Sequence, residues 1–192
     1  PIEKVGMAIP GFVDDESGMI YWAPNFGHYE GTLFHYWQDV PLRKLLEKHL
    51  DLPLVMGNDA NLAALGEYRF GSGNNAAKSL VMITLGTGVG GGVVIDPSSV
   101  QGNLSSPVVL LGGNRGGAEF GHISLNPSGV ECTAGSYGCL EAYCQRDSII
   151  RRAQYKLKRG RKSYINELVQ GDLSKVEPLH ITQACDQSDE VA

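Results

Sequence analysis

The chain has 192 residues, of which 42% are hydrophobic and 19% charged, so it can bury the core of one large domain or two small lobes and is not disordered. Its formal net charge of -5 gives no general attraction to nucleic acid or to anionic membranes. The most apolar run, residues 81–95, is too short and too rich in glycine to span a bilayer. No signal peptide is visible, so we expect a cytoplasmic protein.

The first 75 residues predict alternating strands and helices. Strands are expected at 5–9 and 52–56, because both segments are short and apolar. Apolar residues recur with helical spacing over 41–50, a segment that opens with a proline, and a second helix is expected from about 60 to 70. The aromatic-rich segment that begins at Ala23 is expected to be a loop.

The second part follows a cluster of glycine, serine and asparagine at 71–75, which is a candidate boundary between two lobes. Strands are predicted at 80–85 and 92–96, joined by a tight glycine turn. A loop rich in glycine, serine and proline, or an irregular hairpin around residues 108–111, is expected over 97–117. A long helix is expected from about 139 to 159.

An amide and a carboxylate stand together where the strand at 52–56 ends and the next helix begins. These residues are Asn58 and Asp59. In open α/β sheets the carboxyl ends of strands face the ligand crevice, and an aspartate there can act as a general base. Both residue types also favour the N-cap of a helix, so a purely structural role is equally open. Asn61 and Glu67 are expected to be surface or packing residues of the same helix.

The glycine turn is a candidate phosphate site. Gly86, Gly88 and Gly91 satisfy the G-x-G-x-x-G spacing, but a dinucleotide fold needs a helix after the turn and this chain has a strand, which argues against that fold. Glycine lets backbone N–H groups approach phosphate oxygens, and Thr84 and Thr87 add hydroxyl donors. The alternative is a tight hairpin in which glycine serves only the turn.

Glutamate, histidine and cysteine are mixed over the next segment. Glu119 and His122 are three residues apart and can converge on one ligand. His122, Cys132 and Cys139 are ligands of the kind that hold zinc, which usually takes four in closed sites. Cys144 is a possible fourth ligand. The alternative is a structural histidine beside buried, reduced thiols.

A basic run extends from Arg146 to Lys162, with eight Lys or Arg residues against one Asp. Apolar residues keep one helical face within it: Ile149, Ile150, Ala153 and Leu157. We interpret the charges as the solvated side of that helix, because no aromatic residues or binding motif of a nucleic-acid protein accompany them.

Six segments follow one another along nearly the whole chain: Gly6–Gly11, Ala23–Asn25, Gly57–Glu67, Ile83–Gly92, Gly117–His122 and Gly138–Glu141. This ordered set resembles the ROK family (repressors, open reading frames and sugar kinases) of the actin-like ATPase superfamily. The resemblance implies an α/β fold of the actin-like, ribonuclease H-like type with two lobes. Residues 1–75 would belong to the N-terminal lobe and residues 76–192 to the C-terminal lobe.

The resemblance also implies an ATP-dependent hexose kinase, with the conversion of glucose to glucose 6-phosphate as the expected reaction. Asp59 is similar to the family's general base, which takes the proton of the sugar hydroxyl that attacks the γ-phosphate. The sugar ligands would be Asn58, Glu119, His122 and Glu141. The second phosphate loop would be Gly86, Thr87 and Gly88. ATP with Mg²⁺ is the expected cofactor, since phosphoryl transfer needs positioning and charge neutralisation.

Other expectations concern the ends of the chain and its partners. The family's first phosphate hairpin would precede Pro1 and its adenine-side segment would follow Ala192, so we expect a chain truncated at both ends and inactive as an isolated fragment. A homodimer is expected, without membrane binding. Two alternatives remain: a sugar-responsive repressor, which needs an upstream helix-turn-helix domain to bind DNA, and a non-catalytic sugar-binding module.

One departure from the family concerns zinc. The family's motif is a histidine followed by Cys-x-Cys-Gly-x-x-Gly-Cys. His122, Cys132 and Cys139 match its zinc ligands, but Ala134 stands at the middle cysteine. Zinc binding could therefore be lost, weakened, or rescued by Cys144 or water.

Overall fold

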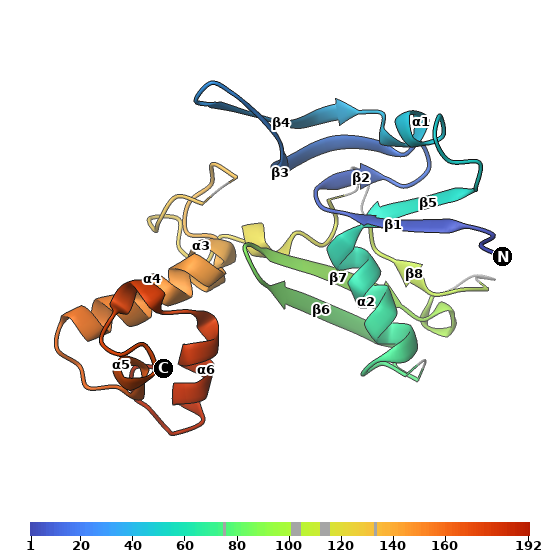
Figure 1. The fold of residues 1–192 in the computed structure, drawn as a ribbon. Coiled ribbons are helices and arrows are strands. Elements are labelled where there is room, and N and C mark those ends of the chain that lie inside the picture. Colours follow the sequence, from blue (N-terminus) through green and yellow to red (C-terminus); the bar gives the residue numbers. More distant parts are fainter. Residues whose placement is uncertain (75, 101–104, 112–115, 133) are drawn as a thin grey trace. The chain divides into compact units, whose positions relative to one another are not determined.

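The computed structural model is a mixed α/β fold, as predicted, and it describes residues 1–74, 76–100, 105–111, 116–132 and 134–192 (Figure 1). Parts of the expected boundary at 71–75 and of the expected loop at 97–117 lie outside these residues. Among the described residues, no helix is both long enough and apolar enough to cross a membrane.

Contacts divide the chain into two compact units. Unit 1 consists of Pro1–Ile83 and Gly90–Glu119, and unit 2 consists of Thr84–Val89 and Phe120–Ala192. Each unit is described by itself. The expected boundary between two lobes at residue 75 stays a prediction.

A parallel pair of strands opens unit 1. β1 (Val5–Ile9) has the predicted bounds and pairs with β5 (Leu54–Asn58), with Ile9 opposite Asn58. β5 begins two residues later than the predicted strand at 52–56. The pairing brings the turn after β1 and the start of the helix after β5 to the same edge of the sheet.

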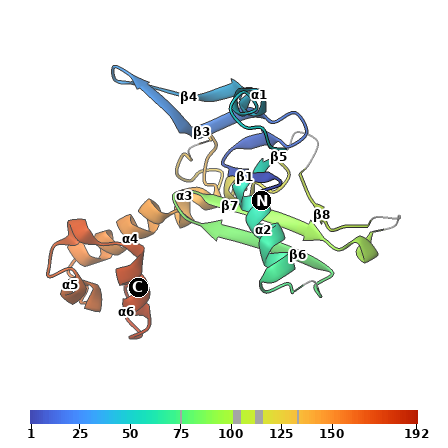
Figure 2. The same ribbon diagram turned by 45° about the vertical axis from the view of Figure 1, so that its right-hand side comes forward.

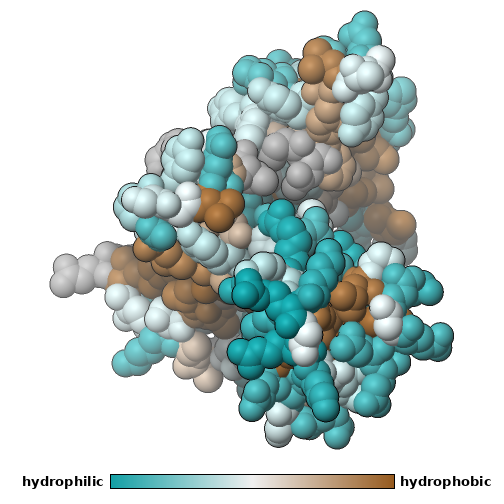
Figure 3. Space-filling view, turned by 90° about the vertical axis from the view of Figure 1, so that its left-hand side faces the viewer, coloured by the Kyte–Doolittle hydropathy of each residue, from teal (hydrophilic) through white to brown (hydrophobic). Residues whose placement is uncertain are grey.

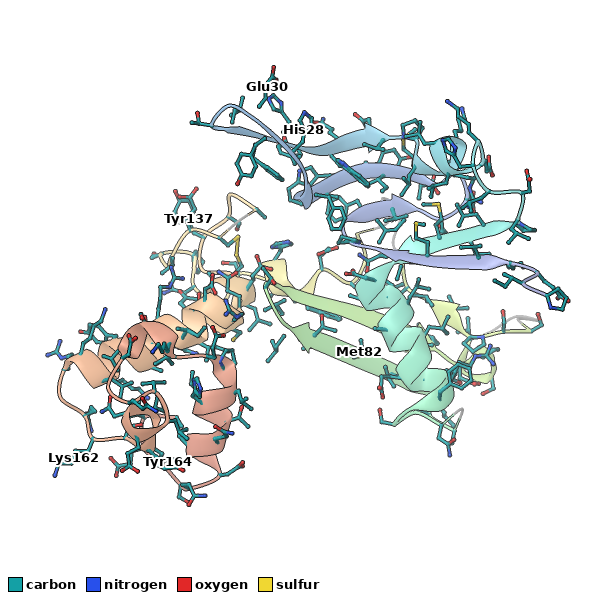
Figure 4. The ribbon with its side chains drawn as sticks, viewed as in Figure 1. His28, Glu30, Met82, Tyr137, Lys162 and Tyr164 are labelled. Atoms are coloured by element: carbon teal, nitrogen blue, oxygen red, sulfur yellow. A yellow bond between two sulfur atoms is a disulfide. The ribbon has the colours of Figure 1, made fainter. Side chains whose placement is uncertain are left out.

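The aromatic segment is a β-hairpin, so the prediction of a loop there was wrong. β2 (Phe12–Asp14), β3 (Met19–Glu30) and β4 (Leu33–Val40) form an antiparallel sheet. The hairpin is stabilised by aromatic pairs across the strands, with ring centroids 5.4 Å apart for Phe26 and Trp37 and 5.0 Å for Tyr29 and Phe34. Figure 4 shows His28 and Glu30 toward the end of this hairpin.

A shared core joins the β1–β5 pair and the sheet of β2, β3 and β4. It consists of Ile9, Val13, Ile20, Ala23, Leu54 and Met56. The short helix α1 (Leu42–Leu46) follows Pro41 and covers only the first half of the predicted helix at 41–50. Arg43 on α1 donates hydrogen bonds to the carbonyl oxygens of Leu54 and Asp15, which fastens the helix to this core.

A long helix packs on the third sheet. This sheet has the order β6 (Ser79–Leu85), β7 (Val89–Ile95) and β8 (Val108–Val109), and α2 (Asp59–Phe70) lies over β6 and β7 (Figure 2). A methyl group on Gly92 would lie 2.5 Å from Cβ of Ala64, so only glycine lets the helix approach this closely. The helix and the strands at 80–85 and 92–96 were predicted within a few residues.

A buried tyrosine links α2 to the end of β7. The hydroxyl of Tyr68, on α2, donates to the carboxylate of Asp96 at 2.5 Å. This hydrogen bond raises the pKa of Tyr68. The pKa of Asp96 is lowered, first by the Ser98 hydroxyl and then by Tyr68.

Unit 2 is mainly helical. The predicted helix at 139–159 is interrupted at Gln145, where ψ is 157°, and becomes α3 (Leu140–Cys144) and α4 (Arg146–Lys158). α5 (Tyr164–Leu168) and α6 (Pro178–Cys185) complete the unit. The 3-10 helices in the described part of the chain are η1 (Pro97–Ser99), η2 (Phe120–His122) and η3 (Leu173–Lys175).

The helices α4, α5 and α6 surround one core. Its members are Ile150, Ala153, Leu157, Ile165, Val169, Val176, Ala184 and Val191. The basic residues of α4 lie on the other side of that helix, where Arg151, Arg152 and Lys158 are exposed, as predicted. In the space-filling view, hydrophilic side chains gather over these helices (Figure 3).

Candidate functional site

Asn58 caps α2 and ties it to the turn after β1. Its Oδ1 accepts a hydrogen bond from the backbone N–H of Asn61 at 3.0 Å, and its Nδ2 donates to the carbonyl oxygen of Gly11 at 3.1 Å. The predicted helix cap is therefore confirmed for Asn58. The same two bonds fix the direction of its amide, which would matter for any ligand that it binds.

Gly11 makes this connection possible. Its φ is +94°, a conformation that other residues rarely adopt, and a methyl group there would lie 2.2 Å from the carbonyl oxygen of Trp22. The turn therefore fits closely between β3 and Asn58, and any side chain at position 11 would push it away.

Asp59 is the first residue of α2. Its side chain is exposed, and Oδ1 accepts from the N–H of Ala60, the next residue of the same helix, at 2.9 Å. The helix dipole stabilises a carboxylate in the first turn. The carboxylate is thus held at the carboxyl end of β5, where solvent reaches it.

The rest of α2 is structural, in agreement with the sequence. Asn61 is buried, and the carboxylate of Glu67 accepts from the N–H and the hydroxyl of Ser72, each at 3.1 Å. These bonds, the backbone one first, lower the pKa of Glu67. Glu67 therefore stabilises the turn that follows the helix.

The glycine turn is a hairpin between β6 and β7, so the argument against a dinucleotide fold is confirmed. The N–H of Gly86 donates to the carbonyl oxygen of Gly88 at 2.9 Å, which closes the turn, and Thr87 between them is exposed. The backbone N–H groups of Thr87 and Gly88 and the threonine hydroxyl are donors of the kind that bind phosphate.

Unit 2 fastens this turn from two sides. The N–H of Val89 donates to Oε2 of Glu141 at 2.9 Å, in a bond that is buried. The N–H of Arg146 donates to the carbonyl oxygen of Gly86, also at 2.9 Å. Both anchoring groups come from the α3–α4 segment, on either side of the break at Gln145.

Glu141 lies in the first turn of α3, and its residue is only 8% exposed. The resemblance to the ROK family implied only a sugar-binding role for Glu141, and the bond to Val89 was not predicted. A clue was Gly88, where a methyl group would lie 2.6 Å from Oε2 of Glu141. The carboxylate approaches the turn so closely that only glycine fits beside it.

The predicted metal ligands come together in unit 2. Single ligand atoms of His122, Cys132 and Cys139 all lie within 4.8 Å of one another, and both cysteines are buried. Ala134 is exposed and offers no ligand atom, and Cys144 is not part of this group. The set fits three of the four ligands of a structural zinc site.

The same two cysteines are joined as a disulfide, seven residues apart in the sequence. Zinc needs thiolates, so the disulfide and a zinc ion are mutually exclusive at this place. Tyr137 lies on the loop between them (Figure 4).

The remaining predicted ligand is Glu119, which is half-buried and ends a segment of unit 1, whereas His122 belongs to unit 2. Their convergence on one sugar therefore stays a prediction. Asn58 and Asp59 belong to unit 1, whereas Glu141 and the glycine turn belong to unit 2. That these residues form one site also stays a prediction.

The fold is that of an actin-like ATPase, and the chain belongs to the ROK family, whose profile matches residues 2–192. The chain is 34% identical to the glucokinase of Streptomyces coelicolor over 193 residues, covering 100% of this chain and 55% of that protein. It is 29% identical to the xylose repressor of Caldicellulosiruptor bescii, in a match that covers 97% of this chain and 41% of that repressor.

A solved structure supports the fold. It is a ROK family glucokinase from Streptomyces griseus in complex with glucose and AMPPNP, which matches with a TM-score of 0.75 at 35% identity and covers 100% of this chain and 55% of that one. The predicted fold class is thus confirmed. The chain spans about half the length of the curated glucokinases that it matches.

Proposed function

We propose that the protein carrying this chain is an ATP-dependent hexose kinase and that glucose is its substrate. The observation that carries the proposal is Asp59, an exposed carboxylate held at the end of β5 by the capped start of α2. The glycine hairpin and the similarity to glucokinases support it.

In this proposal Asp59 accepts the proton of the sugar's 6-hydroxyl group while that oxygen attacks the γ-phosphorus of ATP. The bond from the γ-phosphorus to the oxygen bridging to the β-phosphate breaks, and ADP leaves with that oxygen. The products are glucose 6-phosphate and ADP, and Asp59 returns its proton to solvent. Most of the catalysis would come from positioning and charge neutralisation.

The other residues would bind the reactants. Glu119, His122 and Glu141, with Asn58, would hold the sugar hydroxyls, because carboxylates accept hydrogen bonds from neighbouring hydroxyl groups. The turn of Gly86, Thr87 and Gly88 would bind the phosphates of ATP, with the backbone N–H groups of Thr87 and Gly88 and the Thr87 hydroxyl as donors. ATP would enter with Mg²⁺.

Zinc belongs to the proposal as a structural ion. His122, Cys132 and Cys139 would hold it in the reduced protein, and it would then stabilise the loop before α3. We also propose that the protein is cytoplasmic and forms a homodimer. Light scattering of the purified protein would test the homodimer.

The direct test is ADP release by the protein at its full natural length, with ATP and one sugar at a time. We expect turnover with glucose, and a lower kcat/KM with fructose, mannose and N-acetylated hexosamines. The same protein should form glucose 6-phosphate in step with ADP. Absence of sugar-dependent ADP release would reject the kinase.

A second candidate is a sugar-responsive repressor, which the similarity to a xylose repressor favours. A repressor would bind an operator DNA and release it when sugar is added, without forming ADP. The two functions are therefore separated by measuring DNA binding and ADP release on one preparation.

A further inference from the structure

The strongest unassigned feature is the bond between Glu141 and the glycine turn. We propose that Glu141 is a positioning residue for the nucleotide: its carboxylate holds the N–H of Val89 and so keeps the turn at Gly86–Gly88 in the shape that receives phosphates. The inference rests on the proposed function, since it assigns to one of the proposed sugar ligands a second role at the phosphate turn.

The bond is specific and well shielded. The residues of both partners are buried, Val89 at 3% and Glu141 at 8% exposure, and the N···O distance is 2.9 Å. A buried hydrogen bond to a charged group is stronger than one in water, and an unpaired partner there is costly.

The turn has little freedom while this bond exists. Gly88 leaves no room for a side chain between the turn and the carboxylate, and the N–H of Arg146 holds the carbonyl oxygen of Gly86. Glu141 and Arg146 lie at the starts of α3 and α4, so one segment of the chain sets both ends of the turn.

The geometry has a functional consequence. A carboxylate has about four acceptor positions, so a bond to Val89 is compatible with a sugar contact. A sugar hydroxyl that orients Glu141 would also steady the turn. Glucose should then tighten nucleotide binding, and by linkage the nucleotide should tighten glucose binding by the same factor.

The first experiment measures the bond itself, by hydrogen exchange at the Val89 amide in the ligand-free protein. In Glu141→Ala the exchange should be about tenfold faster, while Glu141→Gln, whose carbonyl can still accept, should stay near the wild type. The matched control is Glu131→Ala, an exposed glutamate of the same unit, which should change nothing. Unchanged exchange in Glu141→Ala overturns the inference whatever the protein's activity.

The second experiment measures the dissociation constant of AMPPNP with Mg²⁺ in the absence of sugar, by calorimetry. Glu141→Ala should weaken binding about tenfold and Glu141→Gln less than threefold. A residue that only binds sugar would leave this constant unchanged, and that result overturns the inference while the kinase stands. A wild type that binds no nucleotide overturns the proposed function and the inference together.

A double-mutant cycle shows whether the turn depends on this carboxylate. Gly88→Ala should weaken AMPPNP binding because its methyl group displaces Glu141, but it should have almost no further effect in the Glu141→Ala protein, where the space is empty. Strictly additive effects would mean that position 88 acts without Glu141, and would overturn the inference.

Discussion

Asp59 and Glu141 are two carboxylates in the first turns of two helices, and their surroundings differ. Asp59 is exposed, and its carboxylate accepts a hydrogen bond from the N–H of Ala60, the next residue of its own helix. Glu141 is buried and bonds to Val89, 52 residues away. Position at a helix start therefore does not decide the role of a carboxylate. Because Glu141 is buried and accepts a hydrogen bond from a distant backbone N–H, it helps to hold the structure of the turn. The exposed carboxylate of Asp59 is accessible to a substrate.

The largest expected effect comes from Asp59→Asn. The amide cannot take the proton, so kcat should fall about a thousandfold while the KM for glucose changes less than about threefold. Coupled ADP release measures both constants. Asp51→Asn, an exposed aspartate before β5, is the control and should keep full activity. Equal turnover of Asp59→Asn and the wild type would reject Asp59 as the base.

The next effect concerns Gly11, in the turn after β1 that accepts a hydrogen bond from Asn58. Gly11→Ala should lower the free energy of unfolding by about 2–4 kcal/mol, because the methyl group meets the carbonyl oxygen of Trp22 in a positive-φ turn. Urea denaturation measures it. Gly6→Ala, whose methyl group would meet nothing within 4 Å, should be close to neutral. Identical unfolding of the two variants would contradict the close fit of this turn.

Zinc affinity should respond to the missing ligand. Reduced wild-type protein should hold about one zinc through His122, Cys132 and Cys139, and Ala134→Cys should tighten it at least about tenfold by completing four ligands. Competition with a chromophoric chelator measures the affinity, and Cys139→Ser should lose the ion. Absence of zinc from both the wild type and Ala134→Cys would reject the site.

The helix cap should have a smaller effect. Asn58→Ala should cost about 1 kcal/mol of unfolding free energy, and Asn58→Ser should recover part of it because serine also caps. Neither variant keeps the donor to Gly11, so the difference between them isolates the cap. Equal stability of the two variants in urea would show that the cap does not contribute.

The smallest effect is a pH dependence at the end of α2. The pKa of Glu67 is lowered from 4.5 by Ser72, so its ionised form adds stability above the unfolded pKa, and this is lost as pH falls through the folded pKa. Glu67→Gln should be slightly less stable than the wild type at pH 7, and the difference should shrink as the pH falls through the folded pKa. The control is Glu47→Gln, an exposed glutamate. A difference in stability that does not shrink on acidification would contradict this origin.

The sequence predicted the local elements well. β1 agrees to the residue, and α2 begins one residue from its expected start, because short apolar runs and the polar pair Asn58–Asp59 are local signals. The Gly86–Gly88 hairpin was also predicted, since a strand and not a helix follows it.

Non-local pairing could not be predicted in this way. The aromatic hairpin of β3 and β4 depends on pairs such as Phe26 with Trp37, which no local pattern announces. The break at Gln145 has no proline or glycine, and it coincides with the bond from Arg146 to the turn. The bond from Val89 to Glu141 likewise depends on tertiary structure.

The contrast between the two carboxylates can be tested in one series, which measures kcat with glucose and the sugar-free dissociation constant of AMPPNP for Asp59→Asn and Glu141→Ala. We predict that Asp59→Asn lowers kcat about a thousandfold and leaves AMPPNP binding unchanged. Glu141→Ala should weaken AMPPNP binding about tenfold. Turnover of Asp59→Asn at the wild-type rate would contradict the central claim that Asp59 is the base of a sugar kinase.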